Sequence, residues 1–215
     1  ALWKGSNTAS PFIYVSNAGT VACTPAANSS RVLIATLCLS GLSAPAVTWN
    51  AVSMTLIGSK ATANGRLCAY FGLINPASGA QTMSGSWTGG FSTPAVLCGQ
   101  MYYNADQTTG WNGFLTAGPT TSTAQTITIT TTNGDMASVA GLDDNASTET
   151  IVNGTQDWKE NLFDGNYVGG HRAATSSSTQ INWTLGTSVS WAMVGVNVLQ
   201  VSGAPKRLPT LGVGE

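Results

Sequence analysis

The chain has few charged residues. Of its 215 residues, 8% are Asp, Glu, Lys or Arg, against about 25% in an average soluble protein. The formal net charge is -1, so no excess of basic side chains exists to bind a phosphate backbone, and we expect no nucleic-acid partner. Gly, Ser, Thr, Asn and Ala are abundant instead. Neutral polar surface of that kind loses its water against a neighbouring protein more cheaply than charged surface does.

The common motifs of catalysis and metal binding are also missing. His171 is the single histidine, so a Ser-His-Asp arrangement would have to use it, and no G-x-S-x-G segment is present. We predict that His171 is a surface or loop residue. The four cysteines lack C-x-x-C spacing, which argues against structural zinc. We therefore expect a protein that is not an enzyme and that holds no cofactor and no metal.

Acidic residues gather in the stretch 141–178, which has the weakest periodicity and where we expect long loops. Two carboxylates there could serve glycoside hydrolysis, and a cluster of them could hold Ca²⁺. No D-x-[DN]-x-[DN]-G loop is present, and acidic residues in loops are usually just solvated. The candidates are Asp143, Asp144, Glu149, Asp157, Glu160 and Asp164.

Long apolar runs and helical periodicity are almost absent. No run approaches the ~18 residues of a membrane-spanning helix, so we expect no membrane partner. Segments with a period of two, bounded by Gly, Pro, Asn and Ser, instead predict an all-β, antiparallel sandwich or jelly roll. The predicted strands are 11–16, 31–40, 46–49, 52–59, 66–74, 80–88, 94–103, 124–131, 136–142, 157–163, 167–174, 179–185 and 189–201.

Several of these strands are apolar on both faces. In 31–40, Leu33, Ala35, Leu37 and Leu39 form one face, which we assign to the core. The opposite face is also apolar, although an antiparallel sheet normally presents polar residues to water. We predict that this second face is an interface with another layer or subunit; the alternative is that loops from 141–178 cover it within the same chain. The interface candidates are Val32, Ile34, Cys38, Cys68, Tyr70, Cys98 and Tyr102.

Cysteines and tryptophans give two further candidate sites. Cys23 lies in VACTPAANSS, which we interpret as a mobile loop, so it is the cysteine expected to form a disulfide, within the chain or between subunits. The strand cysteines are expected to stay reduced. Trp111 and Trp158 lie in predicted loops or at strand edges, so they are the candidates for stacking on a glycan.

The end of the chain differs in composition from the rest. Residues 1–201 are expected to form one sandwich domain, and 202–215 an extended arm that docks on a neighbour. Lys206 and Arg207 lie between two prolines, which cannot join a central strand, and they complete the interface candidates. The first ten residues, ALWKGSNTAS, lack the basic start and apolar segment of a signal peptide.

Four blocks resemble a known family in their order. They are VTWNAVSMTLIGS (47–59), YFGLINPASGAQTMSGSW (70–87), YYNADQTTGW (102–111) and WAMVGVNVLQV (191–201), and the resemblance that they mark extends over about half of the chain. They resemble jelly-roll modules of bacteriophage virion proteins and bacterial surface proteins, in which a Y-N-G-V hairpin, a P-x-x-G turn and a G-V-D-Q segment follow one another. Ala51 stands where that family has glycine. The motifs mark turns, and the family offers no common catalytic residues to carry over.

The resemblance implies a non-enzymatic virion structural protein, a capsid decoration or head-fibre subunit that binds and stabilises an assembled particle. Its partners would be copies of itself and other virion proteins, and it would be made in the host cytoplasm. The alternative is a carbohydrate-binding or receptor-binding module of an adhesin or tail fibre, which would act outside the cell or at its surface on a cell-surface glycan.

Overall fold

The structure of the protein is a computed structural model that describes residues 3–4, 18–25, 27, 30–41, 44–88, 95–144, 148–162 and 165–201. These residues contain no helix, and their strands pair antiparallel throughout. The predicted all-β fold is confirmed. The strands are β1 (Trp3–Lys4), β2 (Ala18–Cys23), β3 (Val32–Leu39), β4 (Ala46–Trp49), β5 (Val52–Ser53), β6 (Thr55–Ala61), β7 (Leu67–Ile74), β8 (Gln81–Ser86), β9 (Ala95–Tyr103), β10 (Trp111–Thr130), β11 (Met136–Asp143), β12 (Glu149–Asn153), β13 (Thr155–Leu162), β14 (Gly165–Ala173) and β15 (Ser178–Val198).

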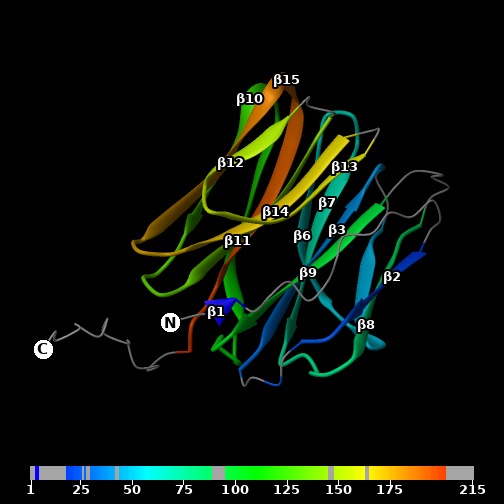
Figure 1. Cartoon of the computed structure of the whole chain (residues 1–215), viewed down its shortest axis with the longest axis vertical. Helices are drawn as coiled ribbons and strands as arrows, with labels where there is room; N and C mark the ends of the chain where they lie inside the picture. The colour runs from blue at the N-terminus through cyan, green and yellow to red at the C-terminus, as the bar shows by residue number, and fades with distance from the viewer. Residues whose placement is uncertain are drawn as a thin grey trace, which may run out of the picture.

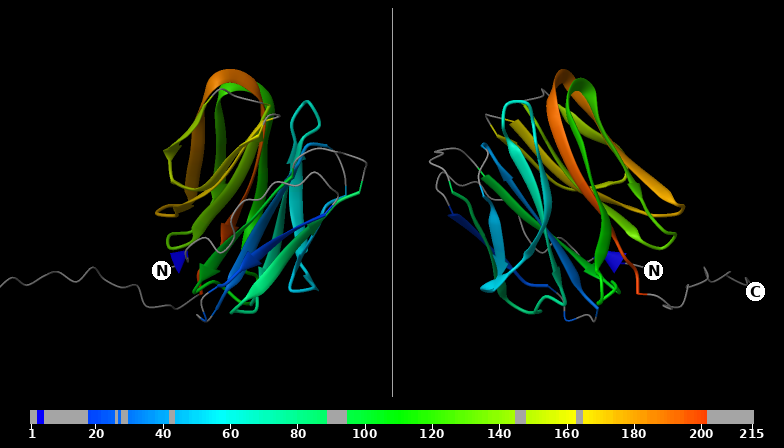
Figure 2. Two further views of the ribbon diagram at one scale, coloured as in Figure 1. Left: turned by 45° about the vertical axis from the view of Figure 1, so that its right-hand side comes forward. Right: turned by 180° about the vertical axis from the view of Figure 1, so that it is seen from behind.

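The strands form three sheets, and one of them lies between the other two (Figure 1). The central sheet has the order β1-β9-β3-β7-β6, and the outer sheet has the order β2-β8-β4-β5. The C-terminal sheet has the order β10-β15-β11-β14-β13, with β12 also paired to β15. Figure 2 shows the three sheets from two further directions. The chain is therefore a layered β-sandwich, and its jelly-roll connectivity stays a prediction.

The strand predictions hold best where the period of two is strict. Strands β3, β4, β7, β9 and β11 begin and end within a residue of their predicted bounds. The two strands expected over 179–185 and 189–201 are one continuous strand, β15. Strands β2 and β12 and the first half of β10 were not predicted, and much of 141–178 is strand rather than loop. The strand expected at 11–16 lies outside the described residues.

The first core lies between the central and outer sheets. The central-sheet residues in this core are those that the alternating pattern predicted to face it, so the predicted inward face of these strands is confirmed. Trp49 and Met83 of the outer sheet are buried against them. Full burial of side chains of this size contributes about 1.5–3 kcal/mol each, which makes this core a principal source of stability. From the central sheet, the core takes Leu33, Ala35, Leu37, Leu39, Leu67, Ala69, Phe71, Leu97 and Met101.

The second core lies between the central and C-terminal sheets, and we call it the inter-sheet layer. Val32, Ile34 and Tyr70 of the central sheet contribute to it, and each is 0% exposed. They pack with residues of β11, β13, β14 and β15. The apolar second face of the central sheet is therefore covered by strands of the same chain. The C-terminal sheet contributes Met136, Ala140, Leu142, Trp158, Tyr167, Val194, Val196 and Val198.

A third core lies on the far face of the C-terminal sheet, where the long β10–β15 strand pair folds back over it. The β10–β15 register shifts at three places along the pair, and such irregularities bend a strand pair. The part of β10 that contains Ile127 and Ile129 then lies over Gly195 and Val139. The bend is visible at the upper end of the molecule in Figure 2. It lets a single sheet bury both of its faces.

The hairpin between β4 and β5 turns through Asn50 and Ala51. Their φ angles are 48° and 66°, so both central residues are left-handed, as a two-residue type I′ turn requires. Asparagine tolerates this conformation, whereas an alanine Cβ makes it costly. The sequence did not determine the turn type here. In the structure Ala51 occupies the second turn position, where a type I′ turn favours glycine.

We expect Ala51→Gly to raise the free energy of unfolding by about 1 kcal/mol, because glycine adopts a positive φ without the Cβ clash. Urea denaturation followed by tryptophan fluorescence would measure the change. Ala63→Gly in the β6–β7 turn is the control, since Ala63 does not have a positive φ, and it should be neutral or destabilising. A stability loss at position 51 would contradict the strained turn.

Candidate functional site

The seven interface candidates of the central sheet all lie in the inter-sheet layer. Each is at most 1% exposed, so the face they form is closed to any second protein. The prediction that this face is buried against another layer or subunit is confirmed for a layer: strands of the C-terminal sheet cover it, so neither a second subunit nor loops from 141–178 do. The candidates placed in this layer are Val32, Ile34, Cys38, Cys68, Tyr70, Cys98 and Tyr102. Lys206 and Arg207, with the rest of the predicted arm, lie outside the described residues.

The cysteines are not arranged as predicted. Cys23 ends strand β2 and is buried in the first core, 3% exposed, so it does not lie in a mobile loop. Cys38 and Cys68 are directly opposite each other on β3 and β7, with their Sγ atoms 3.0 Å apart. Cys98 lies on the other side of β3, opposite Thr36. All four are free thiols in this structure.

Burial makes the thiols of Cys23, Cys38 and Cys98 weak acids. It raises the pKa of Cys23 to about 11 and holds the pKa values of Cys38 and Cys98 well above the usual range. The hydrogen bond with Cys68 raises the pKa of Cys38 further. Because the thiolate is the nucleophile and the metal ligand, these cysteines are unreactive while the fold is closed.

A chain of polar side chains crosses the inter-sheet layer from Tyr70 to His171. The Ser138 hydroxyl donates to Gln100 Oε1 at 3.0 Å and lies 3.4 Å from the Tyr70 hydroxyl. The Gln100 amide nitrogen donates to the carboxylate of Asp157, and His171 Nδ1 approaches the same carboxylate at 2.9 Å. The chain thus ties the central sheet to β11, β13 and β14.

This chain contains a serine, a histidine and an aspartate, but it is not arranged as a catalytic triad. Ser138 lies opposite His171 in the register of β11 and β14, yet its hydroxyl is bound to Gln100 and Ser138 is 0% exposed. His171 is therefore a strand residue bound to Asp157 rather than a free surface histidine. Sequence reasoning missed this pairing, because the two residues are 14 apart and meet only through the β13–β14 hairpin.

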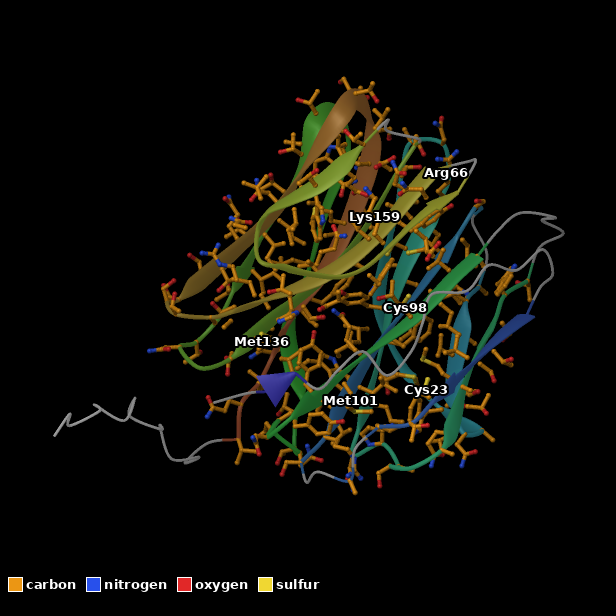
Figure 3. All side chains as sticks on the ribbon, in the orientation of Figure 1. Cys23, Arg66, Cys98, Met101, Met136 and Lys159 are labelled. Atoms are coloured by element: carbon orange, nitrogen blue, oxygen red, sulfur yellow. The ribbon has the colours of Figure 1, made fainter. Side chains whose placement is uncertain are left out.

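Other acidic residues are held between the sheets instead of lying in solvated loops. Asp143 is 0% exposed and accepts from the Asn166 amide at 3.1 and 3.2 Å. Asp144 forms an ion pair with Arg66 at 3.1 Å. Figure 3 labels Arg66 near the upper end of the molecule, where the β6–β7 turn reaches the C-terminal sheet. These contacts join the two sheets at one end.

Glu149 is the most perturbed of the carboxyl groups. It is 5% exposed, and neither carboxyl oxygen has a hydrogen-bond partner. Burial, together with the negative charge of Asp143, raises its pKa to about 8, and Lys159 opposes this. The Lys159 ammonium donates to the backbone oxygen of Glu149 at 2.7 Å. Burial closes the carboxyls of both Glu149 and Asp143 to a polysaccharide, so they do not serve glycoside hydrolysis in this fold.

We expect Glu149→Gln to stabilise the protein in a pH-dependent way. Because the pKa of Glu149 is raised in the fold from 4.5 to about 8, the stability that its protonated form contributes is present below pH 4.5 and is lost as pH rises to about 8. The variant should equal the wild type near pH 4 and exceed it near pH 9 by about 4–5 kcal/mol, which is the free-energy equivalent of raising the pKa from 4.5 to about 8.

Urea denaturation at a series of pH values would measure this difference. Glu160→Gln, on the neighbouring strand β13, controls for the loss of any carboxylate. A stability difference between the Glu149 variant and the wild type that stays constant from acid to alkaline pH would refute the assignment.

The two tryptophans proposed as a glycan platform are packed inside the protein. Trp158 is 6% exposed and lies over Gly169, in the inter-sheet layer. Trp111 is partly buried and lies over Gly72 of β7, where an added Cβ would come within 2.4 Å of its ring. The prediction of a stacking surface is wrong for Trp158. One face of the Trp111 ring packs on Gly72, so that face cannot stack on a glycan.

We expect Gly72→Ala to cost about 2–3 kcal/mol of stability, because the new methyl group displaces the Trp111 ring from the sheet. Thermal and urea unfolding would measure the loss. In a Trp111→Ala background the same substitution should cost clearly less. Gly85→Ala on β8 is the control, since its nearest side-chain atoms lie at an ordinary 3.4 Å; equal losses at the two glycines would contradict this account.

The described surface carries few fully exposed charges. Of the charged residues whose side chains the structure describes, three are buried, eight are partly buried, and Arg172 is exposed; Arg172 donates to the Gln180 backbone oxygen. The β10–β15 strand pair presents hydroxyl and amide side chains in rows along its outer surface. Examples are Thr116, Thr120, Thr121, Thr128, Thr130, Gln180 and Thr184.

The exposed large apolar residues include a pair at one edge. Val52 on β5 is 55% exposed and Leu56 on β6 is 50% exposed. β5 ends the order of the outer sheet and β6 ends that of the central sheet. We call this pair the β5–β6 edge. It combines apolar side chains with strand backbone that has no neighbour on one side, which is the usual template for pairing with another chain.

No family model, curated protein or solved structure matches the chain. Within the described part of the chain, no three His, Cys, Asp or Glu side chains are grouped so that they could hold a metal ion. The same residues include no helix that is long and apolar enough to cross a membrane.

Proposed function

We propose that this protein is a structural subunit of a virion, a capsid decoration or head-fibre protein, and that it acts by binding other protein subunits rather than by catalysis. The observation that carries the proposal is the low charge of the described surface, where most charged side chains are partly or fully buried and Arg172 is the fully exposed one. Neutral polar groups are cheaper to desolvate in a contact than ions are. A net charge near zero also favours association over colloidal repulsion.

The arrangement of the layers supports the same function. The central sheet is buried on both faces within one chain, so contacts with other subunits are left to the outer surfaces and the sheet edges. The β5–β6 edge is the surface we assign to a neighbouring subunit, because Val52 and Leu56 are exposed there at the ends of two sheets. Burial of two such side chains would contribute on the order of 3 kcal/mol to a contact.

We expect the tagged protein, expressed in the cell that naturally produces it, to sediment with particles at a fixed stoichiometry in a density gradient. The double variant Val52→Ser, Leu56→Ser should reduce the particle-bound fraction at least tenfold, because it removes the apolar contact. Quantitative mass spectrometry of the gradient fractions would measure both.

Val152→Ser is the matched control, since Val152 is equally exposed, at 60%, but lies on β12 away from that edge. It should leave the bound fraction unchanged. Protein found only as a monomer at the top of the gradient would refute the virion proposal. Particle binding that survives the double variant would refute only the choice of edge.

A further inference from the structure

Two of the buried cysteines are placed as a disulfide would place them. Cys38 and Cys68 are register partners on adjacent antiparallel strands, so their side chains point to the same face of the central sheet. Their Sγ atoms are 3.0 Å apart. A disulfide requires about 2.05 Å between the sulfurs, so closing the bond takes a movement of about 1 Å.

The backbone around the pair already has the required spacing. β3 and β7 pair without a register shift over eight consecutive positions, from Val32 with Ile74 to Leu39 with Leu67. Directly opposed residues of an antiparallel pair have Cα atoms about 4.5–5.5 Å apart, within the range that disulfides span. Side-chain rotation therefore suffices, and the strands need not move.

The other two cysteines are placed less favourably. Cys98 faces the same layer, but it lies opposite Thr36 on the far side of β3, one diagonal step from Cys38. Cys23 belongs to the first core, on the opposite face of the central sheet. The register thus favours one pairing among the four cysteines and leaves the other two as thiols.

We infer that Cys38 and Cys68 form a reversible cross-strand disulfide when the chain folds in the presence of a disulfide oxidant such as glutathione disulfide. The two thiols lose their two hydrogens as the S–S bond forms, and one glutathione disulfide is reduced to two glutathione molecules. The bond closes a loop between positions 30 residues apart and fastens β3 to β7. The inference does not depend on the virion assignment.

The burial of Cys38 and Cys68 determines when during folding the disulfide can form. Thiol–disulfide exchange needs a thiolate that the oxidant can reach, and both cysteines are 0% exposed in the closed fold. Oxidation therefore takes place before the C-terminal sheet has covered the inter-sheet layer. Once made, the bond is sheltered by the same burial from reductants.

The test refolds the full chain from denaturant in a mixture of reduced and oxidised glutathione, then alkylates the remaining thiols under denaturing conditions. We expect two alkylated thiols per chain and an S–S link between peptides that contain positions 38 and 68. Cleavage after Arg31 separates Cys23 from Cys38, and cleavage after Tyr70 or Phe71 separates Cys68 from Cys98, so the two cuts together assign the bond. The bridged protein should melt roughly 5–10 °C above the reduced protein.

Two variants provide matched controls. Cys98→Ala should retain the bridge, and Cys68→Ala should lose it and melt at the same temperature with and without reductant. Four alkylated thiols in the refolded wild type would overturn the inference, and so would a bond that maps to Cys98 or Cys23. If a variant does not fold, the peptide assignment in the wild type decides the question alone.

Discussion

The rest of this structure depends on the burial of both faces of the central sheet. Strands β3, β7 and β9 carry apolar side chains on both faces, and such strands are stable only when another layer covers each face. The outer sheet covers one face with Trp49 and Met83, and the C-terminal sheet covers the other with β11, β13, β14 and β15. Every cysteine and most of the large aromatic residues are sealed inside as a result.

The same packing determines where the ionisable groups lie. In a chain with 8% charged residues, several of the described acidic groups are bound by polar neighbours: Asp143 by Asn166, Asp144 by Arg66, and Asp157 by His171 and Gln100. Buried polar groups are stable only when they are hydrogen-bonded. The Asp144–Arg66 and Asp157–Gln100 contacts join the central sheet to the C-terminal sheet, whereas the other two join strands within the C-terminal sheet. Glu149 is the exception, and its raised pKa is the consequence.

The described exterior is mostly hydroxyl and amide side chains, with partly exposed charges such as Lys60 and Asp106 among them. A surface with few charges gives weak long-range steering and low colloidal repulsion, and it is easily desolvated in a close contact. This distribution of charge is the basis of the assembly role proposed above.

The sequence by itself determined the fold class, the bounds of β3, β4, β7, β9 and β11, and the parity that faces the first core, because alternation and turn residues act within a few positions. The sequence left the turn type at Ala51 open, and the structure shows it to be left-handed. What covers the second face of the central sheet was decided only by the tertiary structure, as were the placements of Cys23, Trp158 and His171. Those outcomes depend on pairings between segments far apart in the chain, such as β11 with β15 and β3 with β7. The local periodicity of a strand shows which face is apolar, but it does not show which distant strand will cover that face.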